Sequence, residues 1–258
     1  METLKEKLEE FANHSKETVE QLNDEFEKLA PFFLSGGYIK VREDYRVYPT
    51  TIEFYFHSEK KDGVKDPIVY HRNNRFVHGN IPYFPMMSLH AHDVGYDITF
   101  EDETEQYRAS VLIRKYQIWW WESKNNGCWL KWQKDDSASH YDSQKYKFLP
   151  CKKNVNPTNT QVTSLKYILN SFPTNGKDCI CWEDSKTFLS LGEGIEKGTY
   201  RQNVAEYEYK NDGEYEKRRV EGNPTYFDKD KCFRSDGITY WRCLRPWSFS
   251  RKEPILIP

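Results

Sequence analysis

The sequence contains few cysteines and no long apolar segment. Its six cysteines are scattered over 258 residues, which is sparse for a disulfide framework, so we expect reduced thiols and a cytoplasmic protein. No segment approaches the roughly 18 apolar residues that a membrane-spanning helix needs, and the mean hydropathy is −0.91. The charged start of the chain lacks the apolar segment of a signal peptide. We therefore expect neither a signal peptide nor a membrane partner.

Several common enzyme motifs are also missing. The chain has no Gly-x-Ser-x-Gly elbow, no phosphate-binding Gly-x-x-x-x-Gly-Lys loop and no Gly-x-Gly-x-x-Gly fingerprint. The usual signs of serine hydrolases, NTPases and NAD-dependent enzymes are therefore lacking. Cys179 and Cys181 have no second pair at zinc-finger spacing, so we do not expect a zinc site there.

The net charge of −2 conceals an uneven distribution. Residues 1–30 carry nine acidic residues and four lysines, a net charge of −5, so the rest of the chain has a net charge of +3. The acidic total therefore does not argue against a nucleic-acid partner. Lysines also alternate with Tyr146 and Phe148 over residues 145–153, which is typical of a solvated face or of a surface that follows a phosphate backbone.

Apolar residues recur at helical spacing in residues 4–29, with Glu and Lys between them. The pattern predicts one long amphipathic helix, or two helices that meet near His14 and Ser15, with Ser15 capping the second. Pro31 is expected to end the helix. We expect the helix to pack along the side of the domain. The alternative is a helix-mediated coiled-coil dimer, because the apolar spacing nearly follows heptads.

Alternating and apolar segments predict a series of strands after this helix. Strands are expected at residues 38–41, near Val47, and at residues 50–57, 95–100, 109–114 and 238–244, with Pro49 separating the second from the third. Turn sequences at residues 125–127 and 211–213 predict hairpins. No repeat or clear linker divides the chain. We expect one domain over residues 1–258, with a helical N-terminal extension over residues 1–30 and a core over residues 31–258.

One predicted strand carries the most reactive combination of side chains. In residues 50–57, alternation places apolar side chains on one face (Ile52, Phe54 and Phe56) and polar ones on the other (Thr51, Glu53, Tyr55 and His57). A carboxylate, a phenol and an imidazole side by side are costly to bury and useful to display. Glu53 is therefore a candidate general base. The alternative is a surface glutamate on an edge strand.

A second candidate site contains His90 and His92, which share one face of a predicted strand and are followed by Asp93. Two histidines and a carboxylate can bind one metal ion, and the protein would then be a metal-dependent hydrolase. A His-x-His sequence is also common by chance. We therefore expect no metal.

Five short motifs occur in a set order along the chain. The first three are Leu-Ala-Pro-Phe-Phe-Leu-Ser-Gly at residues 29–36, Ile-Glu-Phe-Tyr at residues 52–55 and an acidic loop from Asp66 to His71. The fourth is Ala-Ser-Val-Leu-Ile-Arg at residues 109–114, which ends nineteen residues after Gly95. The fifth is an aromatic and basic strand that ends at Pro246 and Trp247. In this order the motifs resemble those of the alkyladenine (3-methyladenine) DNA glycosylase family. The resemblance covers residues 29–114 and, more weakly, the last twenty residues.

The resemblance implies an α+β fold, with a curved, mainly antiparallel sheet and surrounding helices. It also implies a base-excision DNA repair enzyme that needs no cofactor and flips a damaged or modified base out of duplex DNA. Tyr55 and His71 would stack on that base. Glu53 would deprotonate a water that attacks the sugar C1′ and would stabilise the oxocarbenium-like transition state. Arg114 would hold the water or a backbone phosphate.

The chain departs from the family at the residues that read the base. The family's pocket asparagine corresponds to Glu101, its tyrosine wedge to Val94 and a second stacking tyrosine to Ala91. Valine can still wedge as an apolar side chain, and His90 or His92 would supply the missing aromatic face. We therefore expect a DNA N-glycosylase-like hydrolase with an altered substrate. The alternative is a non-catalytic nucleic-acid or protein-binding module on the same scaffold.

Overall fold

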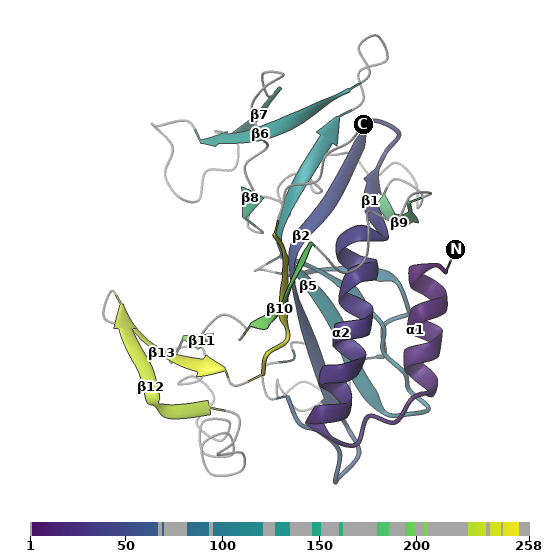
Figure 1. Ribbon diagram of the computed structural model, residues 1–258, viewed down its shortest axis with the longest axis vertical. Helices are drawn as coiled ribbons and strands as arrows, with labels where there is room; N and C mark the ends of the chain where they lie inside the picture. Colours follow the sequence, from purple (N-terminus) through teal and green to yellow (C-terminus); the bar gives the residue numbers. More distant parts are fainter. Residues whose placement is uncertain are drawn as a thin grey trace.

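The protein has an α+β fold in which two helices cover one face of a curved antiparallel sheet (Figure 1). The structure is a computed structural model, and it describes residues 2–66, 69, 82–92, 95–120, 127–134, 146–150, 160–161, 180–185, 194–199, 204–205, 227–235, 238–243 and 245–252. The expected fold class and the antiparallel sheet are confirmed.

The helices are α1 (Leu4–Asn13) and α2 (Val19–Ser35). Within the described residues the large sheet holds eleven strands: β1 (Gly37–Val41), β2 (Tyr45–Ser58), β3 (Ser88–His92), β4 (Gly95–Thr99), β5 (Tyr107–Trp120), β6 (Cys128–Lys134), β7 (Tyr146–Pro150), β8 (Thr160–Gln161), β9 (Ile180–Asp184), β10 (Ile195–Thr199) and β14 (Ser248–Arg251). A smaller sheet holds β11 (Val204–Ala205), β12 (Phe227–Ser235) and β13 (Ile238–Cys243). The central order is β10-β14-β2-β5-β4-β3, so the two longest strands, β2 and β5, lie in the middle.

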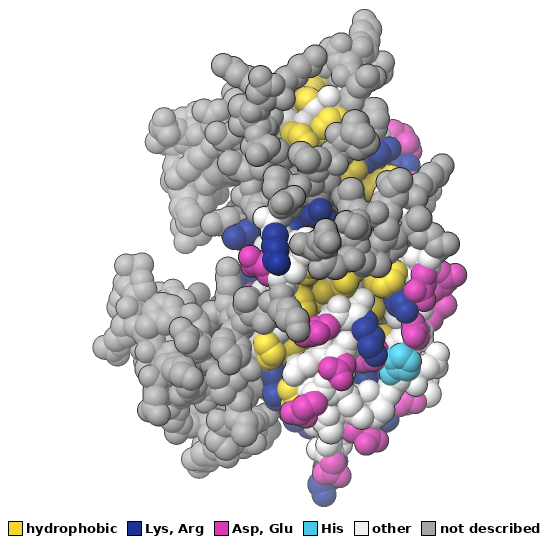
Figure 2. Space-filling model, in the orientation of Figure 1, with side chains coloured by type: hydrophobic (Ala, Val, Ile, Leu, Met, Phe, Trp, Pro, Cys, Tyr) yellow, Lys and Arg dark blue, Asp and Glu magenta, His cyan; other side chains and the backbone are white. Residues whose placement is uncertain are grey.

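Both helices pack their apolar faces against the sheet. Val19 is partly buried against the core, and the other six apolar side chains that predicted the amphipathic pattern are at most 2% exposed: Leu4, Leu8, Phe11, Leu22, Phe26 and Leu29. Phe26 of α2 stacks on Phe54 of β2 with ring centroids 4.4 Å apart. Packing along the domain is therefore confirmed. A dimer through residues 4–29 would need another face of the helices, and Figure 2 shows charged side chains of both signs on the outer surface of this side of the molecule.

The helix boundaries differ from the predicted ones at two points. The second helix is capped by Thr18 rather than Ser15, because Thr18 and Gln21 form a reciprocal capping box. The prediction that Pro31 ends the helix is wrong, since α2 continues past it. A proline removes one helical hydrogen bond. Burial of the residues that follow it, including the 0% exposed Phe33, offsets that loss.

Strand β2 runs without a break through Pro49, so the prediction of two strands separated by this residue is wrong. The register of β2 against β5 shifts twice, and Thr50 on β2 and Arg114 on β5 are the extra residues. Such bulges allow a proline, which lacks an N–H donor, to remain in a strand. Because one extra residue lies on each strand, the two shifts compensate and the pairing continues to both ends.

The strands predicted at residues 38–41, 95–100 and 238–244 are confirmed with small changes in their bounds, as β1, β4 and β13. The strand predicted at residues 109–114 is the middle of β5, which extends further at both ends. Pairing of Trp119 with Trp129 confirms that β5 and β6 form a hairpin. Of the predicted turn residues, only Gly127 is described. Gly127 has a φ of +83°, a conformation that favours glycine. The hairpin predicted at residues 211–213 lies outside the described residues. Within the described part of the chain, none of the helices is both long and apolar enough to cross a membrane.

Candidate active site on strands β2 and β5

The polar face predicted for β2 lies on the side of the sheet opposite the helices. Phe54 belongs to the core on the helix side, and Glu53 therefore points the other way. Glu53 is paired with Leu112 of β5 and with Ser248 of β14, so its strand has a neighbour on each side. The residue is only 1% exposed. The alternative of a surface glutamate on an edge strand is therefore wrong.

Glu53, Tyr55 and Arg114 form a closed set of hydrogen bonds. Arg114 Nε donates to Glu53 Oε2 at 2.7 Å, and the Tyr55 hydroxyl donates to the same oxygen at 2.8 Å. Arg114 Nη2 donates to the Tyr55 hydroxyl oxygen at 3.2 Å. Burial acts to lower the pKa of the Arg114 guanidinium, but the interactions with Tyr55 and Glu53 outweigh it and raise that pKa overall. Arg114 is therefore a permanent cation beside the carboxylate.

The bulge on β5 lies at the residue that binds Glu53. Ile113 pairs with Ile52 on the core side and Lys115 pairs with Thr51 on the polar side, which leaves Arg114 as the extra residue between them. An extra residue in a strand re-aims a side chain, and such bulges are over-represented next to active sites. Here the extra residue is the arginine whose side chain holds the Glu53 carboxylate.

The polar face continues as a buried surface over the neighbouring strands. Asp97 of β4 is paired with Leu112, which is also opposite Glu53, and the Ser110 hydroxyl donates to Asp97 Oδ2 at 3.2 Å. Ser110 is 1% exposed and Asp97 is 4% exposed. Neither was predicted to lie near Glu53, because local alternation does not reveal the register between β4 and β5. Burial of so many polar groups is costly unless they are hydrogen-bonded.

Glu101, which was predicted to replace the pocket asparagine, belongs to a different cluster. Its side chain and that of Arg108 are both 0% exposed, and Arg108 Nη1 lies 3.0 Å from Glu101 Oε2. Arg108 also pairs with Glu59 at 3.4 Å. On β5, Arg108 is opposite His57 rather than Glu53. The structure therefore brings Glu101 to the His57 end of the polar face, where its charge is balanced by an arginine.

The other residues predicted to contact the substrate are not described, or are described only in part. His71 and Val94 lie outside the described residues, and only the backbone of His92 is described, at the end of β3. Asp66, the first residue of the predicted acidic loop, is fully buried, and its N–H donates to His57 Nδ1 at 3.1 Å. The roles of His71, Val94 and His92 stay predictions.

The metal alternative at His90 and His92 is described only at His90, because the side chain of His92 lies outside the described residues. The His90 ring lies against Phe84, with ring centroids 4.3 Å apart. Within this part of the chain, no group of three or more His, Cys, Asp or Glu side chains is placed to hold a metal ion. Asp93, the carboxylate of that alternative, lies outside the described residues.

The chemistry available at Glu53 follows from its two partners. A carboxylate held by a cation and a phenol can accept a proton or stabilise a developing positive charge, and its orientation is fixed before a substrate arrives. Comparisons of the chain with protein-family models, with curated proteins and with solved structures give no match. The chemical role of Glu53 is therefore inferred from its geometry and from the motif order.

Proposed function

We propose that this protein is a DNA N-glycosylase-like enzyme, which hydrolyses the N-glycosidic bond of a damaged or modified base flipped out of duplex DNA. The observation that supports this most directly is the closed set of hydrogen bonds joining Glu53, Tyr55 and Arg114. These are three of the described residues to which the resemblance to the alkyladenine DNA glycosylase family assigns a role. The proposal includes a core fold of the kind found in that family.

In the proposed reaction Glu53 accepts a proton from the water that attacks the sugar C1′. Its negative charge also stabilises the oxocarbenium-like sugar as the base departs. Arg114 holds the carboxylate in one orientation through the 2.7 Å hydrogen bond. The Tyr55 hydroxyl donates a hydrogen bond to Glu53, so the Tyr55 ring is the part that stacks on the flipped base.

A non-catalytic nucleic-acid or protein-binding module is the second candidate, and one observation favours it. Glu53 is 1% exposed and its Oε2 accepts hydrogen bonds from both Arg114 and Tyr55. A buried ion pair that serves only the structure has the same features. The two candidates differ in what happens when Glu53 loses its charge but keeps its shape.

The proposed function is tested with a panel of duplexes that carry alkylated, deaminated or hypermodified bases. Abasic sites are measured after alkaline cleavage, in the presence of a chelator so that a metal-dependent hydrolase is silenced. We expect the wild-type protein to release at least one class of base. Glu53→Gln should release it at least about 100-fold more slowly, as expected for loss of a general base. Tyr55→Phe, which loses only the hydroxyl, should fall by about tenfold.

The matched control is Glu196→Gln, which changes an exposed carboxylate on β10 and should leave the rate unchanged. Binding of each variant to the same duplex is followed by fluorescence anisotropy. Tight binding without base release from any duplex would favour the binding module. Release by Glu53→Gln at the wild-type rate would rule out Glu53 as the base.

A further inference from the structure

A second cluster of apolar side chains lies outside the main core, near the ends of β2 and β5 that are far from the helix turn. This aromatic surface consists of Tyr38 of β1, Tyr48 of β2, Trp119 of β5 and Trp129 of β6. Val47 and Ile118, which alternate with these residues, belong to the main core on the helix side. The aromatic surface therefore points away from the helices. Figure 1 shows β2 and β5 extending beyond the helices toward β6 and β7.

The rings of the aromatic surface hold one another in place. Trp119 and Trp129 are directly opposite on β5 and β6 and meet edge to face, with ring centroids 5.0 Å apart. Tyr48 lies 5.8 Å from Trp129 and 5.3 Å from Tyr38, again between ring centroids. The two tyrosines are only 8% and 9% exposed, whereas both tryptophans are partly exposed. The tyrosines therefore support two indoles whose exposed parts a ligand can reach.

Two cations accompany the partly exposed tryptophans. Arg46 of β2 is opposite Trp119, and its guanidinium carbon lies 4.9 Å from the centre of the Tyr38 ring. The Arg46 side chain is partly exposed, and a guanidinium can bind a phosphate through two parallel hydrogen bonds. Lys115 of β5 is exposed and precedes Trp119 by four residues, on the same face. Cations beside exposed aromatic rings are typical of surfaces that bind single-stranded nucleic acid.

Lys115 also connects the aromatic surface with Glu53. It is opposite Thr51, which is two residues before Glu53 on β2, so these three residues share one face of the sheet. Glu53 is itself opposite Leu112. Leu112 and Trp119 are about 20 Å apart along β5, at roughly 3.3 Å per residue with one bulged residue between them. This length corresponds to roughly six nucleotides of a stacked strand.

Two carboxylates, Glu43 and Glu183, lie on the β1 side of the aromatic surface. Both pair with Lys40 of β1, at 3.1 Å and 3.7 Å, and the Tyr38 hydroxyl donates to Glu183. Strands β1 and β5 flank β2 on its two sides. A polyanion is therefore expected to follow β5, past Lys115 and away from these acids.

We propose that the aromatic surface binds a single-stranded segment of DNA next to the nucleotide that reaches Glu53. Bases of this segment stack on the exposed parts of Trp119 and Trp129, and Arg46 and Lys115 bind its phosphates. The choice of DNA as the partner rests on the function proposed above. The preferred substrate is then a duplex that is unpaired beside the modified base, rather than a continuous duplex.

The test measures binding of two labelled strands of about 12 nucleotides, a length within the range of single-strand sites, to the whole chain by fluorescence anisotropy. One strand is oligothymidylate, and the other has the same backbone but no bases. Because only oligothymidylate can stack, it should bind at least about tenfold more tightly. Trp129→Ala should weaken its binding about tenfold or more, as expected for the loss of one stacked base. Trp129→Phe, which keeps a ring, should weaken it less.

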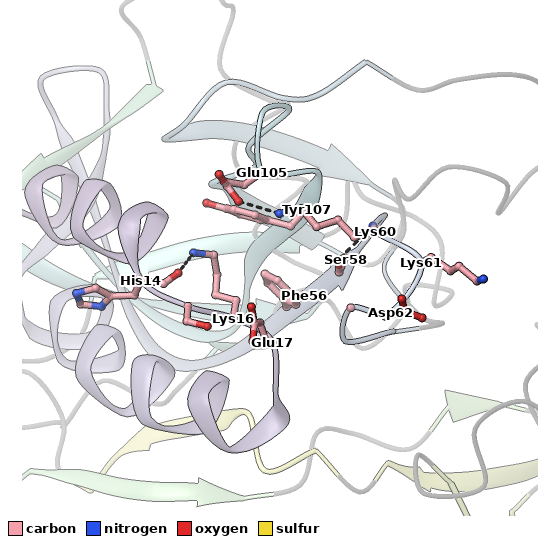
Figure 3. Close-up of a pocket in the computed structure, with 12 residues that line it drawn as sticks. His14, Lys16, Glu17, Phe56, Ser58, Lys60, Lys61, Asp62, Glu105 and Tyr107 are labelled. Atoms are coloured by element: carbon pink, nitrogen blue, oxygen red, sulfur yellow. Dashed lines mark hydrogen bonds and ion pairs between the residues drawn. The ribbon is translucent and has the colours of Figure 1, made fainter.

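The contribution of Arg46 is measured by the dependence of binding on salt. Arg46→Gln should reduce the slope of log affinity against log salt by about 0.7, the value for one phosphate contact on a single strand. The matched control is Lys61→Gln, which removes an exposed positive charge at the opposite end of β2. Lys61 lines a pocket beside the turn between α1 and α2, and Figure 3 shows its side chain pointing away from that pocket. Lys61→Gln should leave affinity and slope unchanged.

Melting temperatures confirm that each variant compared is folded, and the comparison of the two strands needs only the wild-type protein. Equal binding of the two strands, wild-type affinity of both Trp129→Ala and Arg46→Gln, or tighter binding of oligouridylate than of oligothymidylate would each overturn the proposal. Oligothymidylate carries no modified base, so its binding is independent of base release. A protein that shows these binding differences but releases no base would contradict only the function proposed for Glu53.

Discussion

Two arginines of β5, the half-buried Arg114 and the fully buried Arg108, are paired with acidic side chains. Arg114 binds Glu53 at 2.7 Å on the candidate site, whereas Arg108 binds Glu101 at 3.0 Å with both side chains fully buried. Removing the acid from a buried pair leaves a cation without compensation, which is far more costly than removing an exposed pair. The roles of the two acids can therefore be separated by measuring stability and activity in parallel.

Glu101→Ala is predicted to destabilise the fold strongly. The substitution removes the nearer of the two carboxylates that pair with the fully buried Arg108, at 3.0 Å against 3.4 Å for Glu59, and breaking a buried pair costs about 3–5 kcal/mol. The free energy of unfolding from urea denaturation measures the loss. Glu9→Ala, which breaks an exposed pair with Lys5, is the control and should change stability by less than about 1 kcal/mol. An equal, small effect of both substitutions would contradict a structural role for Glu101.

At the scale of elements, the turn from α1 to α2 is fixed by a buried acid, Glu25. Glu25 of α2 accepts hydrogen bonds from Lys28 at 2.7 Å, within the helix, and from His14 at 2.9 Å, at the end of α1. Burial acts to raise the pKa of the Glu25 carboxyl, but these two hydrogen bonds outweigh it and lower that pKa overall. The carboxylate therefore stabilises the helix pair when it is ionised.

The lowered pKa of Glu25 predicts a pH dependence of stability. A group with a depressed pKa in the folded state stabilises the fold above its unfolded pKa, near 4.5, and this contribution disappears as the pH falls through the folded value. Glu25→Gln should therefore lower the melting temperature at neutral pH, and the difference from wild type should shrink below about pH 4. A difference that stays constant from neutral to acidic pH would show that the charge of Glu25 plays no part.

Local sequence patterns predicted most elements but not the points where they depart from ideal geometry. The period of the apolar residues predicted one long amphipathic helix or two shorter ones, of which the structure has two, and alternation predicted both faces of β2. Pro31 and Pro49 were expected to interrupt their elements, yet both lie inside them. In each case tertiary structure decides: the residues after Pro31 are buried in the core, and a bulge at Thr50 accommodates Pro49. Neither can be predicted from neighbouring residues alone.

At the scale of the whole molecule, the C-terminal strand ties the sheet to the second helix. The Trp247 indole is 0% exposed and its Nε1 donates to Asn23 Oδ1 of α2 at 2.7 Å. Arg251 of β14 donates to the Leu34 carbonyl at 2.9 Å near the end of the same helix. Because β14 also pairs with β2 beside Glu53, these contacts help to position the candidate site.

Asn23→Ala tests this link between the two ends of the chain. The substitution takes the side-chain acceptor away from the buried Trp247 Nε1, which should cost about 1–3 kcal/mol of unfolding free energy. The matched control is Asn13→Ala, whose side chain makes an exposed hydrogen bond to the Glu9 carbonyl and should matter much less. Equal urea midpoints for the two variants would argue against the link.

The candidate site was only partly predictable from the sequence, because pairing between strands that are far apart in the chain decides which residues share it. Glu53 and Tyr55 lie on one strand, so alternation placed them together, and the motif order added Arg114. Asp97 and Ser110 come to the same face only through the register between β4 and β5. Glu101 was assigned by spacing along the chain, but its side chain is bound by Arg108. The spacing of residues along the sequence does not predict which distant strands pair or in what register.

The most direct test of the proposed function is the single-turnover rate of abasic-site formation by wild-type protein and by Glu53→Gln at equal concentrations of folded protein. Glutamine preserves the shape of the side chain and an oxygen for Tyr55 and Arg114 to contact, so the comparison isolates the charge. We predict that the wild-type protein releases a base from at least one modified duplex and that Glu53→Gln does so at least about 100-fold more slowly. Equal rates for the two proteins, or no release by the wild-type protein from any duplex that it binds, would contradict the proposal.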